Sequence, residues 1–85
     1  MYFFAEHRHT GSTCFSQDES KRQLFEDLIN SARDNGVIVH QYLKNAPEHR
    51  FFFVLEAENY ESIHNFFMPV LTLGNIEVVP VINSL

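Results

Sequence analysis

The chain has 85 residues, of which 45% are hydrophobic, and its formal net charge is −5. This length allows one domain with a small core, and the acidic charge excludes the clustered basic surface that nucleic-acid-binding and membrane-surface proteins use. No apolar run reaches the roughly 18 residues of a membrane-spanning helix, and residues 1–6 lack the features of a signal peptide. The single cysteine excludes an internal disulfide and fits a reducing compartment. We therefore expect a soluble cytoplasmic protein with one domain, residues 1–85.

The first half of the chain predicts a strand, a loop and a helix. Residues 2–9 contain no Gly or Pro and are expected to form a strand, after which a turn-prone loop leads to Cys14. Ser16 and Glu19 have the spacing of a capping box at a helix start. The apolar stripe of this helix consists of Leu24, Phe25, Leu28, Ile29 and Ala32. Gly36 is suited to the left-handed position that ends a helix.

The second half predicts a hairpin, a second helix and a last strand. Residues 37–43 and 50–57 are joined by a short connection, which indicates an antiparallel hairpin. Asn59 is a suitable N-cap for the second helix. Its apolar stripe consists of Ile63, Phe66, Phe67, Val70 and Leu71. Because Pro69 lacks the N–H of a regular helix, we expect a kink or a restart there, followed by a strand at residues 76–82.

The resulting order, β-α-β-β-α-β, is that of the ferredoxin-like or split-βαβ arrangement, an α+β fold. Right-handed crossovers place both helices on one face of a four-stranded antiparallel sheet with strand order 4-1-3-2. Pro80 in the last strand indicates an edge or a bulge. Within this sheet we expect the first and third strands to be central and to run parallel to each other.

One face of this sheet is left without a covering helix. A strand with one solvated face alternates apolar and polar residues, but residues 51–55, 1–5 and 78–82 are apolar on both sides. Because a large exposed apolar face favours aggregation, we predict a homodimer in which two identical sheets pack face to face around a two-fold axis. In the alternative, the C-terminal segment folds over the sheet, but only residues 83–85 are available for this.

Metal-ligating side chains are predicted to gather at one end of the sheet. His7 and His9 are two residues apart on a strand, so both imidazoles project from one face, and Cys14 follows on the next loop. Two imidazoles and a thiolate suit Cu, Zn or Ni, and their spacing does not select among these metals. With the first and third strands parallel, Glu56 and His40 would border the same end as weaker candidate ligands.

The same residues also have simpler interpretations. The two histidines of the first strand can be ordinary polar residues at a strand end, and Cys14 can be a small buried hydrophobe. Glu56 can be an acceptor that orients an imidazole, or a solvated charge. His49, at the turn of the hairpin, and His64, off the apolar stripe of the second helix, are expected to lie in solvent.

The whole chain resembles the dimeric α/β-barrel superfamily in length, strand order and the expected pairing of sheets. The residues that carry the local similarity are Glu6-His7-Arg8-His9, Cys14, Ala46-Pro47-Glu48-His49, Phe52-Phe53-Val54-Leu55-Glu56-Ala57 and Val79-Pro80-Val81-Ile82. This superfamily includes small cofactor-independent monooxygenases, muconolactone-isomerase-like proteins, and short uncharacterised or nickel-binding members. The resemblance implies a ligand in the barrel interior or between sheet and helices, but a shared fold does not fix an activity.

Three interpretations of the function follow. The first is a homodimeric protein that binds a transition metal through the His-x-His strand end with Cys14 nearby. The second is an enzyme, a cofactor-independent monooxygenase or an isomerase acting on a small aromatic or quinone-like molecule, with His7 beside Glu56 as general base. The third is a structural or interaction module without a ligand. The chain contains no nucleophile elbow and no phosphate-cradling Gly-rich loop, and it has three Gly in all.

Overall fold

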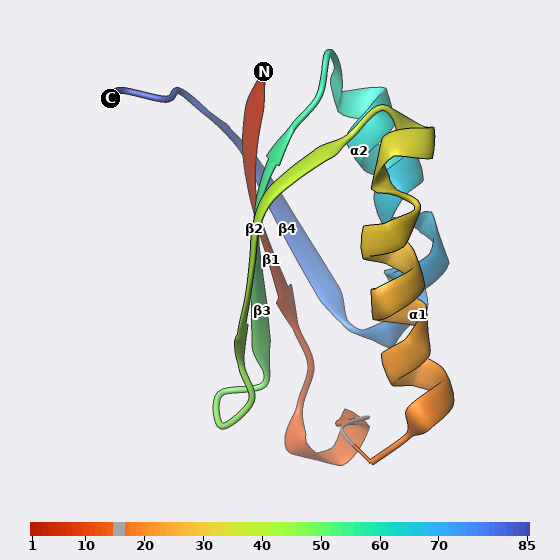
Figure 1. Ribbon diagram of the computed structural model, residues 1–85. Helices are drawn as coiled ribbons and strands as arrows, with labels where there is room; N and C mark the ends of the chain where they lie inside the picture. Colours follow the sequence, from red (N-terminus) through yellow and green to blue (C-terminus); the bar gives the residue numbers. More distant parts are fainter. Residues whose placement is uncertain (15–16) are drawn as a thin grey trace.

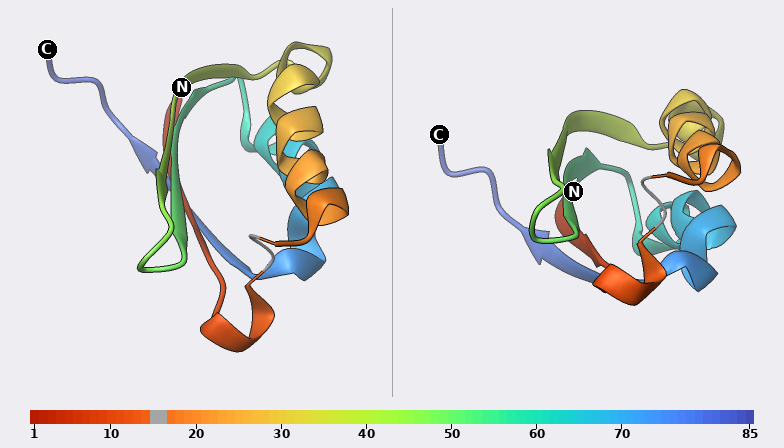
Figure 2. Two further views of the ribbon diagram at one scale, coloured as in Figure 1. Left: turned by 60° about the horizontal axis from the view of Figure 1, so that its bottom comes forward. Right: turned by 90° about the horizontal axis from the view of Figure 1, so that it is seen from below.

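The computed structural model describes residues 1–14 and 17–85 (Figure 1). With η for a 3-10 helix, its elements are β1 (Tyr2–Arg8), η1 (Gly11–Thr13), α1 (Glu19–Asn30), η2 (Ala32–Asn35), β2 (Ile38–Asn45), β3 (Arg50–Glu56), α2 (Tyr60–Phe67), η3 (Met68–Leu73) and β4 (Asn75–Val81). Both α-helices cover one face of the sheet and leave the other face open (Figures 1 and 2). This is the predicted ferredoxin-like βαββαβ fold. No helix of the described residues is long and apolar enough to cross a membrane.

The four strands form one sheet in the predicted order, β2-β3-β1-β4, which places Pro80 on an edge strand. The central strands β1 and β3 pair antiparallel, with Tyr2 opposite Glu56 and His7 opposite Phe51. The expectation that these two strands run parallel is therefore wrong. The physical reason is that the α1 crossover makes β2 parallel to β1, and the hairpin then reverses the direction of β3.

Local signals explain where the helices begin and end. Asp18 is the N-cap of α1, and Asn59 is the N-cap of α2 as predicted; each side chain accepts a backbone N–H from three residues further along. Ser16, the residue expected to start the capping box, lies outside the described residues. Gly36, with φ 75°, ends the helical region after α1 in the left-handed conformation. At Pro69 the α-helix has given way to a 3-10 helix, which confirms the predicted restart.

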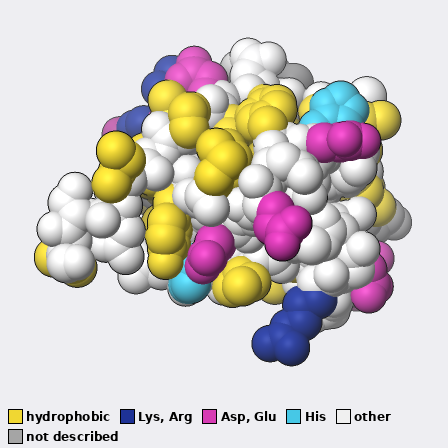
Figure 3. All heavy atoms as spheres, turned by 90° about the horizontal axis from the view of Figure 1, so that it is seen from above, with side chains coloured by type: hydrophobic (Ala, Val, Ile, Leu, Met, Phe, Trp, Pro, Cys, Tyr) yellow, Lys and Arg dark blue, Asp and Glu magenta, His cyan; other side chains and the backbone are white. Residues whose placement is uncertain are grey.

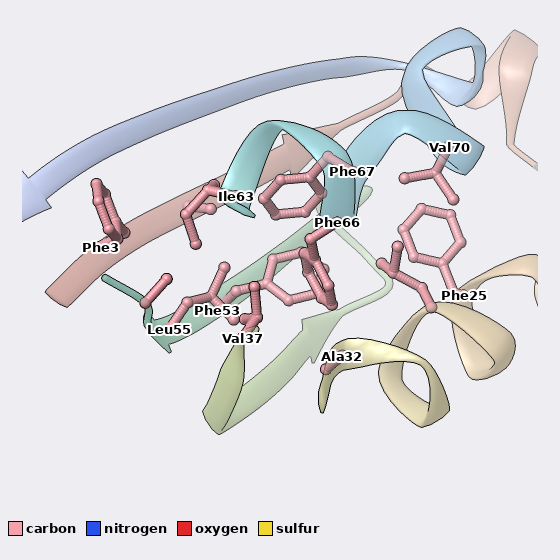
Figure 4. Packing of buried hydrophobic residues seen from close by; sticks show 13 residues of the cluster. Phe3, Phe25, Ala32, Val37, Phe53, Leu55, Ile63, Phe66, Phe67 and Val70 are labelled. Atoms are coloured by element: carbon pink, nitrogen blue, oxygen red, sulfur yellow. The ribbon is translucent and has the colours of Figure 1, made fainter. Parts of the chain in front are cut away.

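The core fills the space between the sheet and the helices (Figure 4). Its members are Phe3, Ala5, Phe25, Leu28, Ala32, Val37, Phe53, Leu55, Ala57, Ile63, Phe66, Phe67 and Val70. Phe53 packs edge-on against Phe67 and stacks on Tyr42, with ring centroids 5.2 and 4.9 Å apart. Aromatic side chains therefore supply much of the apolar surface that this small domain buries.

The open face of the sheet is rich in apolar side chains, as the strand patterns predicted. Val79 and Val81 are 52% and 42% exposed, and Phe4 stacks on Phe52 with ring centroids 6.1 Å apart. After β4 the C-terminal segment leaves the sheet on this side and extends away from the body, with Ile82 88% exposed (Figures 1 and 2). The segment therefore does not fold flat over its own sheet.

On the open face, the carboxylate of Glu6 pairs with two arginines. Arg50 donates two hydrogen bonds to the carboxylate of Glu6, from Nε and Nη2 at 2.9 Å each, and Arg8 pairs with the same carboxylate. These hydrogen bonds, chiefly those from Arg50, lower the pKa of Glu6 to about 2. Glu6 is therefore ionised at every physiological pH.

Candidate metal centre

Three side chains with metal-binding atoms converge just beyond the end of β1. His9, Cys14 and His49 place one nitrogen or sulfur each within 4.8 Å of the other two, and all three residues are half-buried. Ligands bound to one Zn²⁺ at 2.0–2.3 Å lie roughly 3.3–3.8 Å apart. The group therefore needs only a small contraction to enclose an ion of this kind.

The backbone holds two of these residues together. The N–H of His9 donates to the carbonyl oxygen of His49, with the two atoms 3.1 Å apart, which extends the β1–β3 pairing beyond Arg8 and Arg50. His49 has φ 56°, a left-handed conformation in which His is enriched among non-glycine residues. Its N–H donates to the carbonyl oxygen of Ala46 and closes the turn. The imidazole rings of His9 and His49 thereby come within 5.2 Å of each other, centroid to centroid.

The convergence of His49 was missed by the sequence analysis, which expected this residue to lie in solvent at a remote turn. That expectation is wrong because β1 and β3 are antiparallel, so the β2–β3 turn lies beside the end of β1. Antiparallel neighbours are the rule in this fold, and applying that rule to the hairpin would have brought His49 beside His9.

His7 has a different environment from His9, although the two rings are only 5.4 Å apart. Its side chain is fully buried, and its Nε2 donates to the carbonyl oxygen of Leu73 at 3.1 Å. The ring stacks on Phe51 at 5.3 Å and meets Phe25 edge-on at 5.0 Å. Of the predicted ligands, the structure therefore brings His9 and Cys14 together and places His7 behind them, in the core.

Burial also sets the protonation of these imidazoles. Desolvation lowers the pKa of His7, and the hydrogen bond to the Leu73 carbonyl opposes this shift only in part. Desolvation lowers the pKa of His9 as well, with a further contribution from the neighbouring His49. Because metal ions bind the neutral imidazole, these shifts keep His9 in its binding form at neutral pH.

Glu56 and His40, the weaker predicted ligands, lie at the opposite end of the sheet. Glu56 is opposite Tyr2 at the start of β1, and its Oε1 is 2.8 Å from Nε2 of His40. The prediction that these residues border His7 and His9 is wrong, for the same antiparallel reason. The proposed general-base pair of His7 and Glu56 is excluded with it, because the two side chains are at different ends of the strands.

The chain belongs to the family described as "Domain of unknown function (DUF3303)", whose model matches residues 1–84. Among solved structures, SCO4226 from Streptomyces coelicolor A3(2) is similar, with a TM-score of 0.71 and 14% identity over 100% of both chains. An antibiotic biosynthesis monooxygenase is also similar, with a TM-score of 0.54 and 10% identity over 96% of this chain and 98% of that one. No curated protein matches the chain. At these identities the two structures confirm the resemblance at the level of the ferredoxin-like fold.

Proposed function

We propose that this protein binds one transition-metal ion through His9, Cys14 and His49. The observation that carries the proposal is the approach of their ligand atoms to within 4.8 Å from two segments of the chain, the connection after β1 and the turn between β2 and β3. Two imidazoles and a thiolate suit Cu, Zn or Ni, whereas Mg²⁺ and Ca²⁺ require oxygen ligands. Three protein ligands leave a coordination position for water or a further ligand.

In this proposal the residues around the centre hold its ligands in place. The buried His7 fixes the end of β1 through its bond to Leu73, and the left-handed turn at His49 directs that imidazole toward His9. Cys14 must remain reduced to act as a thiolate, which fits a cytoplasmic protein. Acid should release the metal, because protons compete for both imidazoles and for the thiolate.

The test is isothermal titration calorimetry, in which Zn²⁺ is titrated into the untagged protein. We expect one ion per chain, and at least tenfold weaker binding, about 1.4 kcal/mol, in each of His9→Ala, Cys14→Ser and His49→Ala. His64→Ala is the matched control, because His64 is exposed on α2, and this variant should bind as the wild type does. Equal affinities of His49→Ala and His64→Ala would overturn the ligand set. A wild-type protein that binds no Zn²⁺, Ni²⁺ or Cu ion would overturn the function.

We also propose that two copies of the chain pack through their open sheet faces. Support comes from Phe4, Val79 and Val81 on that face and from the C-terminal segment, whose Ile82 and Leu85 are almost fully exposed on the same side. A second copy related by a two-fold axis would cover both the face and the segment. Sedimentation at micromolar concentration should give a dimer, and a folded 10.0 kDa monomer there would contradict the proposal.

A further inference from the structure

The candidate metal centre offers nitrogen and sulfur donors only. His9, Cys14 and His49 contribute two imidazoles and one thiol, and among the residues that the structure describes no Asp or Glu belongs to the group. The opposite end of the molecule, by contrast, exposes Asp and Glu side chains (Figure 3). Carboxylate oxygens suit hard divalent ions, whereas a thiolate selects soft ions such as Cu⁺. The donor set of the centre therefore favours a soft ion.

The imidazole donors of the centre are shielded from water. Nδ1 of His9 and Nδ1 of His49 are both buried from solvent, and within the described part of the chain Nδ1 of His49 has no hydrogen-bond partner. The Phe51 ring packs edge-on against the His9 ring, with centroids 5.7 Å apart. The centre lies on the helix-covered side of the sheet, so a second copy on the open face would not cover it (Figure 1). An ion bound here therefore exchanges its water shell for a site of low polarity.

In such a site the charge of the ion matters. Two neutral imidazoles and one thiolate carry one negative charge, so a Cu⁺ complex is neutral, whereas a Zn²⁺ or Ni²⁺ complex keeps one positive charge. An uncompensated charge that is shielded from water is costly. The nearby ionised groups do not compensate it, because Arg8 and Arg50 share the single carboxylate of Glu6. Glu48, beside His49, is exposed, and the solvent screens its charge.

Three protein ligands also suit the coordination geometry of copper. Copper accepts a trigonal set of two imidazoles and one thiolate, whereas Zn²⁺ is almost always tetrahedral and needs a fourth ligand. With bonds of about 2.0–2.3 Å, trigonal ligands lie about 3.5–4.0 Å apart, and tetrahedral ligands lie roughly 3.3–3.8 Å apart. The ligand atoms of the centre, which lie within 4.8 Å of one another, therefore need less contraction around copper.

We infer that the ion bound at this centre is Cu⁺, held by His9, Cys14 and His49 in a neutral complex with three ligands. This inference rests on the proposed metal-binding function and names its ion. Cys14 releases its thiol proton when the ion binds, and no electron is transferred. A reducing compartment, which the thiol of Cys14 requires, also keeps copper in the cuprous state.

The test is a competition between ions in the untagged protein, without oxygen and with ascorbate as the reductant. The protein is loaded with one equivalent of Cu⁺ and challenged with Zn²⁺, and bathocuproine disulfonate reports the released Cu⁺ by its colour. We expect a tenfold excess of Zn²⁺ to release less than about a tenth of the Cu⁺. Release of half of the Cu⁺ by equimolar Zn²⁺ would overturn the inference and leave the proposed function intact. A protein that binds neither ion would overturn both.

Variants of Cys14 test whether the thiolate selects the ion. Cys14→Ser should weaken Cu⁺ binding more than Zn²⁺ binding, so the ratio of the two affinities should fall by at least about tenfold. Cys14→His keeps three protein ligands in a set that suits Zn²⁺, and it should lower the ratio while Zn²⁺ binding is retained. His64→Ala, exposed on α2, is the matched control and should keep the wild-type ratio. An unchanged ratio in Cys14→Ser would overturn the inference.

X-ray absorption at the copper edge gives a second readout that does not depend on competition. The loaded wild-type protein should show a cuprous ion with one sulfur and two imidazole nitrogens. A fourth ligand, or a cupric ion that persists in the presence of ascorbate, would contradict the neutral complex with three ligands.

Discussion

His7 and His9 are neighbours on one side of the sheet, yet one belongs to the core and the other to the candidate metal centre. Both imidazoles pack against the Phe51 ring, with ring centroids 5.3 Å apart for His7 and 5.7 Å apart for His9. His7 is covered by Phe25 of α1 and hydrogen-bonded to Leu73, whereas His9 lies past the last residue pair of the β1–β3 ladder, where the η1 loop and the hairpin turn approach. The comparison teaches that segments remote in sequence decide the role of each histidine. Its consequences can be tested at both residues.

The largest expected effect comes from Gly74, which lies directly against His7. A Cβ at Gly74 would lie 2.3 Å from the carbonyl oxygen of Arg8 and 2.7 Å from Nε2 of His7, and its φ of 149° disfavours any other residue. Gly74→Ala should therefore lower the free energy of unfolding by about 3 kcal/mol, as measured by urea denaturation. Gly11→Ala is the matched control, because the nearest atom to its added Cβ is 3.9 Å away. Equal stability of the two variants would contradict the tight packing around His7.

Removing each imidazole in turn tests the comparison itself. His7→Ala should lower the free energy of unfolding by about 2–3 kcal/mol, because it leaves a cavity and an unsatisfied Leu73 carbonyl. His9→Ala should lower it by less than about 1 kcal/mol but should weaken Zn²⁺ binding more than His7→Gln does. Urea denaturation and Zn²⁺ titration together give both values. If His9→Ala were more destabilising than His7→Ala, this would contradict the assignment of His7 to the core and of His9 to the metal site.

The pH dependence of stability is a smaller effect with a defined sign. The pKa values of His7 and His9 are lowered in the folded protein. Below pH 6.5 the unfolded chain therefore binds more protons than the folded one, and the free energy of unfolding decreases as the pH is lowered. The loss is at most about 1.4 kcal/mol per pH unit for each group. Urea denaturation between pH 7.5 and 5 should show it, and His7→Gln should reduce the slope. A separate loss below pH 4.5 is expected from Glu6, whose folded pKa is about 2. Stability that rises on acidification toward pH 5 would contradict the buried, neutral state of His7.

Cys14 should have the smallest effect on the metal-free protein. Because this residue is half-buried outside the core cluster, Cys14→Ser should change the free energy of unfolding by less than about 0.5 kcal/mol. In the wild type, a Zn²⁺ concentration of 100 times the Kd should stabilise the fold by about 2.7 kcal/mol. Thermal denaturation with and without Zn²⁺ should show that most of this gain is lost in Cys14→Ser. If Zn²⁺ stabilised Cys14→Ser as much as the wild type, the Cys14 thiolate would not be a ligand.

The elements of the fold could be predicted because each carries a local signal. Helical spacing of apolar residues, the N-cap Asn59 and the edge-strand Pro80 depend only on neighbours in sequence. The strand order followed from the handedness of crossovers. The direction of β3 relative to β1 was nevertheless inferred wrongly, and this one error placed Glu56 and His40 at the wrong end of the sheet.

The candidate site was predictable only in part. His9 and Cys14 are close in sequence, so a local pattern reveals them, whereas His49 reaches them only through the left-handed turn that ends the β2–β3 connection. The burial of His7 depends on the approach of η3, which no local pattern specifies.

X-ray absorption spectroscopy of the Zn²⁺-loaded, untagged protein tests the central claim most directly, because it counts the ligands by element. We predict one sulfur at about 2.3 Å and imidazole nitrogens at about 2.0–2.1 Å, with the sulfur absent in Cys14→Ser and one imidazole fewer in His49→Ala. A spectrum without sulfur in the wild type, or one that His49→Ala leaves unchanged, would contradict a centre built from His9, Cys14 and His49.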